Sequence, residues 1–286
     1  MSDIRPIPKL AGVCGWPIHH SLSPVLHSYW LKRSGISGAY VPFAVQPDKA
    51  IESFQSLKKT SIVGVNVTLP LKRQAFLAAD SHTPDAAKLG VANCLYKSGE
   101  NLIAHNTDLQ GFAAPLLKHV TPQSLAQSSV LVIGAGGASR AVIGSLLSLN
   151  VPEICLMNRT ESKAEDLVKS VDVPNLYTRP WADRDQFAAQ ADIIVNATSA
   201  GMKGFPKLDL SLKLVKQDCL VYDLIYTPKT TPLMRAAKLK GCRVLGGLDM
   251  LIEQARPSFK LFFGALPPEF ADPTETLYQC LESGLR

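Results

Sequence analysis

The segment Ser129–Arg140 has residue types and spacing that suit a nucleotide: an apolar run, then a cluster of glycines, then a helical pattern. A tight turn needs Gly134, and Gly136 lets backbone N–H groups approach a pyrophosphate closely. The start of the following helix supplies partial positive charge for that anion. The third fingerprint position is Ser139 rather than glycine or alanine. The pattern therefore predicts a pyrophosphate site formed by Gly134, Ala135, Gly136, Gly137 and Ala138.

The segment after the next predicted strand indicates which dinucleotide binds. Asn158, Arg159 and Thr160 follow the strand, and Lys163 comes three residues later. An NAD site has Asp or Glu here for the ribose hydroxyls, whereas a guanidinium suits a 2′-phosphate. Cations at the start of a helix are electrostatically unfavourable without an anion. The cofactor we predict is NADP(H), with Thr198 and Met202 of the loop Asn196–Met202 as further contacts.

Another group of polar residues clusters where strands are expected to end in the first part of the chain. Taken singly, each has an ordinary structural explanation, such as an N-cap for Ser23 or a surface position for Lys72. Parallel α/β sheets bind ligands at the carboxyl ends of their strands, so the group also predicts a substrate site. Its members are Ser21, Ser23, Asn66, Thr68, Lys72, Asn93 and the segment Asn106–Asp108.

The elements that must position these residues alternate between short β-rich runs and helical patterns, which indicates mainly parallel α/β sheets. Residues 121–129 are polar and have the composition of a linker. Strands are expected at 10–14, 39–45, 62–68, 92–96, 102–104, 130–133, 154–157, 193–195, 220–223 and 243–245. Helices are expected at 23–32, 47–58, 71–79, 107–119, 137–149, 161–170, 231–241, 250–263 and 273–285.

Composition excludes several classes of protein. Of the 286 residues, 46% are hydrophobic and 19% charged, which suits two globular domains and no disordered or fibrous protein. No apolar run approaches the ~20 residues of a membrane span, and no signal pattern is present, so we expect a cytoplasmic protein without membrane contact. The net charge of +6 comes from scattered basic residues, which favours small anions over nucleic acid. The six cysteines lack zinc-site spacing, and no metal is expected.

Together these motifs resemble those of the shikimate dehydrogenase family, in one order and over nearly the whole chain. The resemblance implies a two-domain α/β enzyme with an inter-domain cleft, which reduces 3-dehydroshikimate to shikimate with NADPH in aromatic amino-acid biosynthesis. Residues 1–106 would form the substrate-binding domain, completed by C-terminal helices in 250–286, and 107–249 a Rossmann-like NADP-binding domain. The matching segments are Gly15–Pro24, Asn66–Lys72, Asn106–Asp108, Gly134–Arg140, Asn158–Thr160, Asn196–Met202, Asp223–Tyr226 and Gly246–Gln254.

The resemblance also implies roles for individual residues. Lys72 and Asp108 would form the catalytic pair, because an ammonium can stabilise charge developing on the substrate oxygen and deliver the proton. Asp249 stands where the family usually has glycine and adds negative charge beside the expected nicotinamide site. Leu224 and Gly247 would flank the nicotinamide. Substrate contacts would come from Ser21, Ser23, Asn66, Thr68, Lys72, Asn93, Asp108, Tyr226 and Gln254.

Two other functions stay open. One is a quinate/shikimate dehydrogenase of broader specificity, since quinate differs by a hydroxyl close to the expected contacts of Ser21 and Ser23. The other, of a different class, is a regulator that senses NADP(H) without turnover, which the retained Lys72 and Asp108 disfavour. A monomer and a homodimer are both compatible with the sequence.

Overall fold

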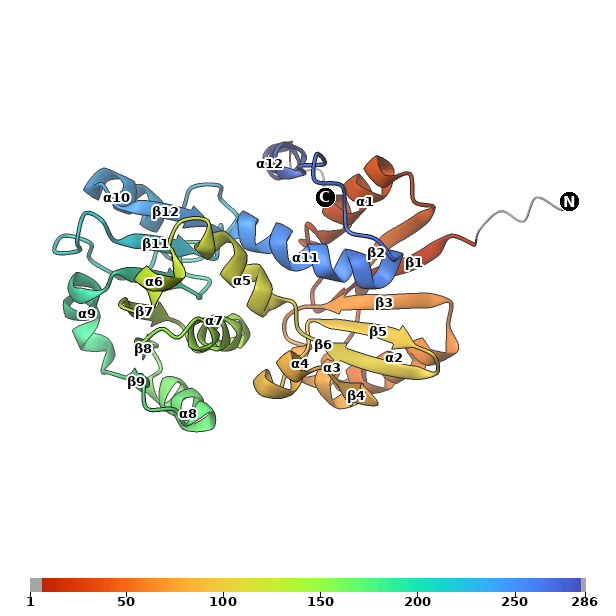
Figure 1. Ribbon diagram of the computed structural model, residues 1–286, viewed down its shortest axis with the longest axis horizontal. Helices are drawn as coiled ribbons and strands as arrows, with labels where there is room; N and C mark the ends of the chain where they lie inside the picture. The colour runs from red at the N-terminus through yellow and green to blue at the C-terminus, as the bar shows by residue number, and fades with distance from the viewer. Residues whose placement is uncertain (1–6, 284–286) are drawn as a thin grey trace, which may run out of the picture. The chain divides into compact units, whose positions relative to one another are not determined.

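The structure is a computed structural model that describes residues 7–283. The chain divides into two compact units, shown with their elements in Figure 1. Unit 1 consists of Met1–Thr107 with Gln254–Arg286, and unit 2 consists of Asp108–Glu253. Unit 2 is therefore inserted in the sequence between two segments that fold together.

Unit 1 is built on a mixed sheet with the strand order β2-β1-β3-β5-β6-β4. The strands β1, β2 and β3 are parallel, whereas β5 and β6 form an antiparallel hairpin. The strands are β1 Lys9–Gly15, β2 Gly38–Ala44, β3 Ile62–Val67, β4 Ser81–His82, β5 Cys94–Ser98 and β6 Asn101–His105. The helices are α1 Ser23–Ser34, α2 Ala50–Ser56, α3 Lys72–Ala78, α4 Pro84–Leu89 and α12 Thr274–Ser283, with part of α11 Gly247–Phe263.

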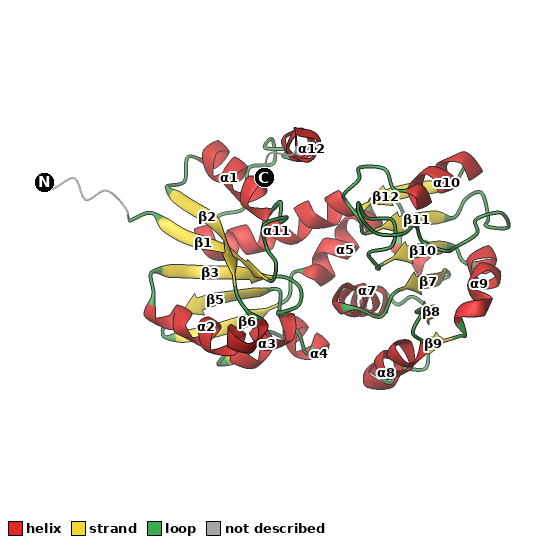
Figure 2. Cartoon of the chain, turned by 180° about the vertical axis from the view of Figure 1, so that it is seen from behind, coloured by secondary structure: helices red, strands yellow, loops and turns green. Residues whose placement is uncertain are grey.

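Helices cover both faces of this sheet (Figure 2), and alternate residues of the central strand β3 pack against them. Val65 and Val67 join a buried cluster with α2 and α3. Gly64 faces the other way, and a Cβ there would lie 2.5 Å from the Phe262 ring of α11. A side chain at position 64 would displace that ring, so the glycine permits α11 to pack directly on the sheet.

Unit 2 contains a fully parallel sheet with the strand order β12-β11-β10-β7-β8-β9. This is the order of a Rossmann sheet, with its topological switch point between β7 and β10. The strands are β7 Ser129–Ile133, β8 Glu153–Met157, β9 Leu176–Thr178, β10 Ile193–Asn196, β11 Leu220–Asp223 and β12 Arg243–Gly246. The helices are α5 Asp108–Leu117, α6 Pro122–Leu125, α7 Gly137–Ser148, α8 Glu161–Val171, α9 Arg184–Gln190, α10 Pro232–Lys240 and the start of α11.

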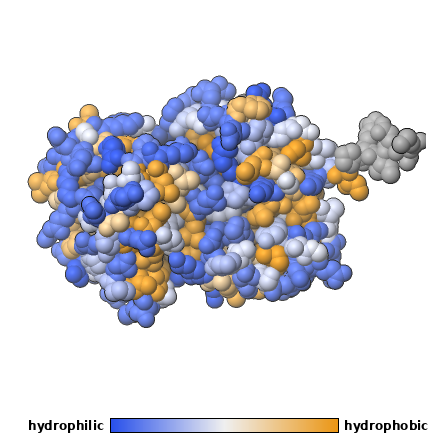
Figure 3. All heavy atoms as spheres, in the orientation of Figure 1, coloured by the Kyte–Doolittle hydropathy of each residue, from blue (hydrophilic) through white to orange (hydrophobic). Residues whose placement is uncertain are grey.

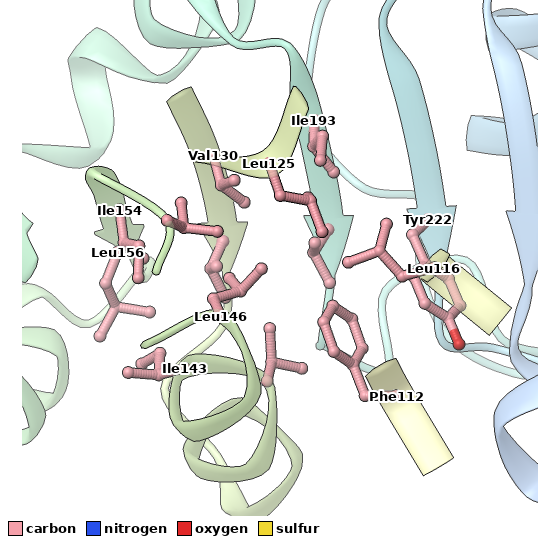
Figure 4. Packing of buried hydrophobic residues seen from close by; sticks show 14 of the residues in the cluster. Phe112, Leu116, Leu125, Val130, Ile143, Leu146, Ile154, Leu156, Ile193 and Tyr222 are labelled. Carbon is pink, nitrogen blue, oxygen red and sulfur yellow. The ribbon is translucent and has the colours of Figure 1, made fainter. Parts of the chain in front are cut away.

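The central strand β7 is apolar on both faces, as a parallel strand covered by helices must be. Val130 and Val132 pack into one cluster with α5 and α7, which Figure 4 shows from close by. Leu131 and Ile133 point to the opposite cluster with α9 and α10. The two-domain α/β architecture, with a Rossmann-like second domain, is thereby confirmed.

Several local predictions are wrong for identifiable reasons. Ser23 is not an N-cap: Leu22 holds that position, and the Ser23 N–H instead donates to the Ser21 hydroxyl at 3.3 Å. The helix predicted over 47–58 is interrupted by 3-10 turns on both sides of α2. The stretch predicted as a linker contains the short helix α6, because the Thr121 hydroxyl accepts the Ser124 N–H at 3.2 Å.

Three observations concern membranes, the surface and metals. Within residues 7–283, no helix combines the length and apolar character needed to cross a membrane. On the face shown in Figure 3, hydrophobic residues lie in separate patches between hydrophilic ones. The same part of the chain has no group of three or more His, Cys, Asp or Glu side chains that could hold a metal ion.

A buried histidine makes unit 1 sensitive to acid. His27 of α1 is fully buried and stacks on the Tyr40 ring, with 3.9 Å between ring centroids. Within the described residues, neither of its ring nitrogens has a hydrogen-bond partner. Burial lowers the pKa of His27 from 6.5 to about 3. Below pH 6.5 the unfolded chain therefore binds the proton more readily, and this part of the stability is lost as the pH falls toward 3.

We expect the free energy of unfolding to fall more steeply with acid in the wild type than in His27→Phe, which keeps an aromatic ring but cannot titrate. The difference between pH 6 and pH 4 should be roughly 2–3 kcal/mol, from the two pKa values. Urea unfolding of both proteins at the two pH values measures it. Parallel acid dependence of the two proteins would contradict the prediction.

Candidate active site

The carboxyl ends of the neighbouring parallel strands β1 and β3 lie side by side in the unit 1 sheet. The Thr68 N–H donates to the Cys14 carbonyl at 2.9 Å, and a Cβ on Gly15 would lie 2.8 Å from Thr68 Cγ2. The chain beyond β1 leads to Ser21, which is half-buried, and Ser23, which is buried. Two loops that carry predicted substrate contacts thus begin at adjacent points of the sheet.

Lys72 is the first residue of α3 and is half-buried. Its backbone carbonyl accepts the Ala92 N–H at 3.0 Å, which fixes the start of α3 against the segment that carries Asn93. The predicted proton donor is therefore joined through its backbone to the residue before Asn93, a predicted substrate contact.

Asn93 in turn fixes the residue before Asp108. Its Oδ1 accepts the Thr107 N–H at 2.8 Å, and its Nδ2 donates to the Thr107 hydroxyl at 2.9 Å. The same Nδ2 lies 3.4 Å from Oε1 of Gln254, which also accepts from the Thr107 hydroxyl at 3.4 Å. Asp108 follows directly as the first, buried residue of α5. Asn93 and Gln254, which are 161 positions apart, are thereby brought together.

Asn66 is the centre of the same polar network. Its Oδ1 accepts from the Tyr40 hydroxyl at 2.8 Å, and its Nδ2 donates to the Ser258 hydroxyl at 2.8 Å and to the Asn93 carbonyl at 3.2 Å. Both amide hydrogens of Asn66 are thus used within unit 1, and its direct contact with substrate stays a prediction.

Tyr40 and Ser258 are the members of this network that the sequence analysis missed. The only available signal was the position of Ser258, four residues after Gln254 on the same helix. Tyr40 lies in β2 and has no motif around it. Both are buried, and both bond to Asn66. The Ser258 hydroxyl also lies 3.5 Å from the Thr107 hydroxyl.

In unit 2 the glycine segment forms the predicted turn between β7 and α7. Gly134 has φ 110°, and a Cβ there would lie 2.8 Å from Thr198 Cγ2, so both the conformation and the space require glycine. This contact also joins the end of β7 to the loop after β10, the two sides of the switch point. The structure therefore brings Gly134 and Thr198 together.

Two backbone N–H groups of this turn already donate hydrogen bonds within unit 2. The Ala135 N–H donates to Asn158 Oδ1, and the Gly136 N–H donates to the Ser139 hydroxyl, both at 3.2 Å. Ser139 at the third fingerprint position is fully buried and closes the turn from inside. Gly137 and Ala138 are the first residues of α7, where N–H groups have no acceptor within the helix. Their amides are available to an anion.

The loop after β8 and the first turn of α8 carry cations beside this turn. Arg159 and Lys163 are both exposed, and Asn158 donates to the Thr160 carbonyl at 2.8 Å in addition to holding Ala135. The nearest carboxylate in sequence, Glu161, accepts the Trp181 N–H at 2.8 Å. A 2′-phosphate suits this arrangement, because both cations are exposed and can donate hydrogen bonds to it.

Leu224 and Gly247 also come together. A Cβ on Gly247 would overlap the Leu224 carbonyl oxygen, so only glycine allows the start of α11 to approach the end of β11. Met202 and Tyr226 are both half-buried, on the loops that follow β10 and β11. These loops and the glycine turn all follow carboxyl ends of strands, where Rossmann sheets bind dinucleotides.

Asp249 lies exposed in the first turn of α11, where a carboxylate interacts favourably with the helix dipole. Burial, together with the charges of Asp249 and Glu253, raises the pKa of Tyr222. The family's usual glycine would leave this helix terminus without that charge.

Two family models match the chain. Residues 13–95 match the shikimate dehydrogenase substrate binding domain, and residues 116–224 match shikimate / quinate 5-dehydrogenase. A curated relative from Paracoccus denitrificans (strain Pd 1222), named shikimate dehydrogenase (NADP(+)), is 41% identical over 271 residues, covering 93% of this chain and 96% of the relative.

Solved structures agree with this similarity. The shikimate 5-dehydrogenase of Thermus thermophilus, in complex with NADP(H) and shikimate, has a TM-score of 0.81 and 31% identity, covering 97% of this chain and 100% of that one. The quinate dehydrogenase of Corynebacterium glutamicum, in complex with NAD, has a TM-score of 0.83 and 25% identity, covering 96% and 99%. With both family models and a relative above 40% identity over most of its length, the chain belongs to the shikimate dehydrogenase (NADP+) family.

Proposed function

We propose that this chain catalyses the reversible NADPH-dependent reduction of 3-dehydroshikimate to shikimate, with unit 1 binding the substrate and unit 2 the dinucleotide. The observation that carries the proposal is the hydrogen-bonded series from Lys72 through Ala92 and Asn93 to Thr107, next to Asp108. It fixes the backbones of both proposed catalytic residues through one set of contacts.

Substrate binding is assigned to the polar side chains of unit 1, with Tyr226 from unit 2. The hydroxyls of Ser21 and Ser23 suit a carboxylate, because each can donate one hydrogen bond to an anionic oxygen. Thr68, Asn93 and Gln254 suit ring hydroxyls, because amides and hydroxyls both donate and accept. Asn66 keeps Asn93 and Ser258 in place for this task.

The proton is assigned to Lys72 and its orientation to Asp108. Reduction leaves negative charge on the former carbonyl oxygen, which the Lys72 ammonium stabilises before donating a proton from Nζ. Oxidation of shikimate reverses the transfer, and Nζ accepts the hydroxyl proton. The bound dinucleotide supplies or accepts the hydride at the substrate carbon.

The residues of unit 2 fit NADP(H). The free amides of Gly137 and Ala138 suit the pyrophosphate, and Arg159 with Lys163 suits the 2′-phosphate. Thr198, Met202, Leu224 and Gly247 are assigned to the nicotinamide end, at loops that the structure brings to one edge of the sheet.

A broader quinate/shikimate activity is the second candidate, supported by the likeness to a quinate dehydrogenase at 25% identity. That neighbour is in complex with NAD. The exposed cations Arg159 and Lys163 favour NADP here, since they suit a phosphate that NAD lacks.

A matrix of shikimate and quinate, each with NADP⁺ and NAD⁺, tests both candidates by following formation of the reduced dinucleotide. Turnover with shikimate and NADP⁺ at least about tenfold above every other pair would support the proposal. Comparable turnover of quinate would establish the broader enzyme. NADP⁺ binding without any turnover would leave a non-catalytic sensor.

We further propose a cytoplasmic location and a monomeric or homodimeric state. All six cysteines are free thiols, five of them buried, which supports a reducing compartment. Light scattering of the purified chain determines the oligomeric state, and a larger assembly would contradict the proposal.

A further inference from the structure

A buried carboxylate without a cation lies at the end of β11. Asp223 is completely buried, and among residues 7–283 it takes part in no ion pair. Its Oδ2 accepts from the Thr231 hydroxyl at 2.5 Å, and its Oδ1 accepts from the Asn196 amide at 3.0 Å and from the Ile225 N–H at 3.2 Å. Burying an ionisable group is costly, so the hydrogen bonds that satisfy Asp223 must hold its neighbours firmly.

One of these neighbours controls the loop after β10. Asn196 pairs with Asp223 in the strand register and is also fully buried. Its Oδ1 accepts both the N–H and the hydroxyl of Thr198, at 3.1 and 2.7 Å, while its Nδ2 reaches the Ala200 carbonyl at 3.2 Å. The bond from Nδ2 to Asp223 fixes the orientation of this amide, and with it the start of the loop.

The other two partners control the segment after β11. The Ile225 N–H bond sets the backbone next to Leu224, and the Ile225 carbonyl accepts the Gly247 N–H at 3.3 Å. Thr231 is the N-cap of α10, where its hydroxyl accepts the Met234 N–H at 3.1 Å. One carboxylate therefore joins two loops and the start of a helix.

We propose that Asp223 is a positioning residue for the nicotinamide half of the dinucleotide. It acts through Asn196 on Thr198 and through Ile225 on Leu224 and Gly247, and it touches no ligand itself. The inference rests on the proposed function, which assigns those three residues to the nicotinamide end. The adenosine half lies with Arg159 and Lys163, which Asp223 does not contact.

This division allows a test with two ligands, NADP⁺ and adenosine 2′,5′-bisphosphate, which lacks the nicotinamide half. Asp223→Ala removes three hydrogen bonds, which act on the dinucleotide only through neighbouring residues. We therefore expect the Kd for NADP⁺ to rise by about tenfold, the equivalent of roughly one net hydrogen bond. The Kd for the bisphosphate should stay within about twofold. Asp223→Asn should have a smaller effect, because its amide oxygen can still accept from Asn196 and Ile225.

The matched control is Asp192→Asn. Asp192 directly precedes β10, at the end of that strand opposite to Asn196. It accepts from the Ser129 N–H at 2.8 Å and pairs with Lys216. It makes as many polar contacts as Asp223 but none with the loops in question. Its substitution should leave the Kd values of both ligands within about twofold of the wild type.

A second pair of variants serves if Asp223→Ala does not fold. Thr231→Val removes the donor to Asp223 with little change in volume and should raise the Kd for NADP⁺ by at least about threefold. Thr231→Ser keeps the hydroxyl and should restore wild-type affinity. Circular dichroism and thermal unfolding show whether each variant is folded.

Unchanged NADP⁺ affinity in folded Asp223 and Thr231 variants would overturn the inference. Equal loss of NADP⁺ and bisphosphate would also overturn it, because that pattern means general damage to unit 2. If the wild-type chain fails to bind NADP⁺ at all, the proposed function fails first and the inference with it.

Discussion

Replacing Lys72 by alanine is expected to lower kcat for shikimate oxidation by about 10²- to 10⁴-fold, the range for loss of a general acid–base group. The KM for shikimate should change by less than about threefold, because serine, threonine and amide side chains are assigned to hold the ground state. Steady-state kinetics at saturating NADP⁺ give both quantities, and calorimetric titration gives shikimate affinity directly.

Lys58→Ala is the appropriate control for this variant. Lys58 is another lysine of unit 1, paired at the surface with Asp80 at 2.9 Å. Such pairs contribute about 0–1 kcal/mol to stability, so kcat should stay within about twofold. If Lys72→Ala instead raised KM with kcat intact, Lys72 would be a binding residue and the proton would have another source.

Replacing Arg159 by alanine should change the choice of dinucleotide. A charge-assisted pair with a phosphate contributes roughly 1.5–3 kcal/mol, so the KM for NADP⁺ should rise by about 10- to 100-fold. The KM for NAD⁺ should change by less than about twofold, since NAD⁺ has no 2′-phosphate. Measuring kcat/KM for both dinucleotides at fixed ionic strength gives the change in preference.

Lys169→Ala is the control for this variant. It removes one positive charge from the last turn of α8, and so distinguishes a direct contact with the 2′-phosphate from the overall electrostatic field of the protein. Exposed charges beyond about 10 Å are largely screened at 0.1 M salt, so this variant should retain the wild-type preference. Equal weakening of NADP⁺ and NAD⁺ by Arg159→Ala would show that the guanidinium does not bind the 2′-phosphate.

The strands and long helices of both units could be predicted because their patterns are local. β7 is a continuous apolar run, and α10 has a threonine N-cap and a glycine with positive φ at its C-cap. Elements with neither a visible period nor a continuous apolar run could not be predicted. α6 has four residues and β9 three, too few for any period to be visible in the sequence.

The residues of the site also differ in how well the sequence predicts them. Gly134 and Arg159 lie in compact motifs whose spacing carries their chemistry. Asn66 and Ser258 meet across 192 positions, and Asn196 meets Asp223 across 27, so no motif of adjacent residues could reveal these contacts. The residues that hold the site are therefore less predictable than the residues assigned to touch its ligands.

The insertion of unit 2 into unit 1 also sets the order in which a growing chain can fold. Trp30 Nε1 donates to the Ala271 carbonyl and Lys9 Nζ to the Phe263 carbonyl, across 241 and 254 positions. These contacts cannot form until the ribosome has synthesised Phe263 and Ala271, and every residue of unit 2 precedes both. Within unit 2, Lys118, which directly follows α5, pairs at 2.8 Å with Glu253, the last residue of the unit. A folded unit 2 therefore shortens the effective loop between the early and late halves of unit 1, which lowers the entropy cost of joining them.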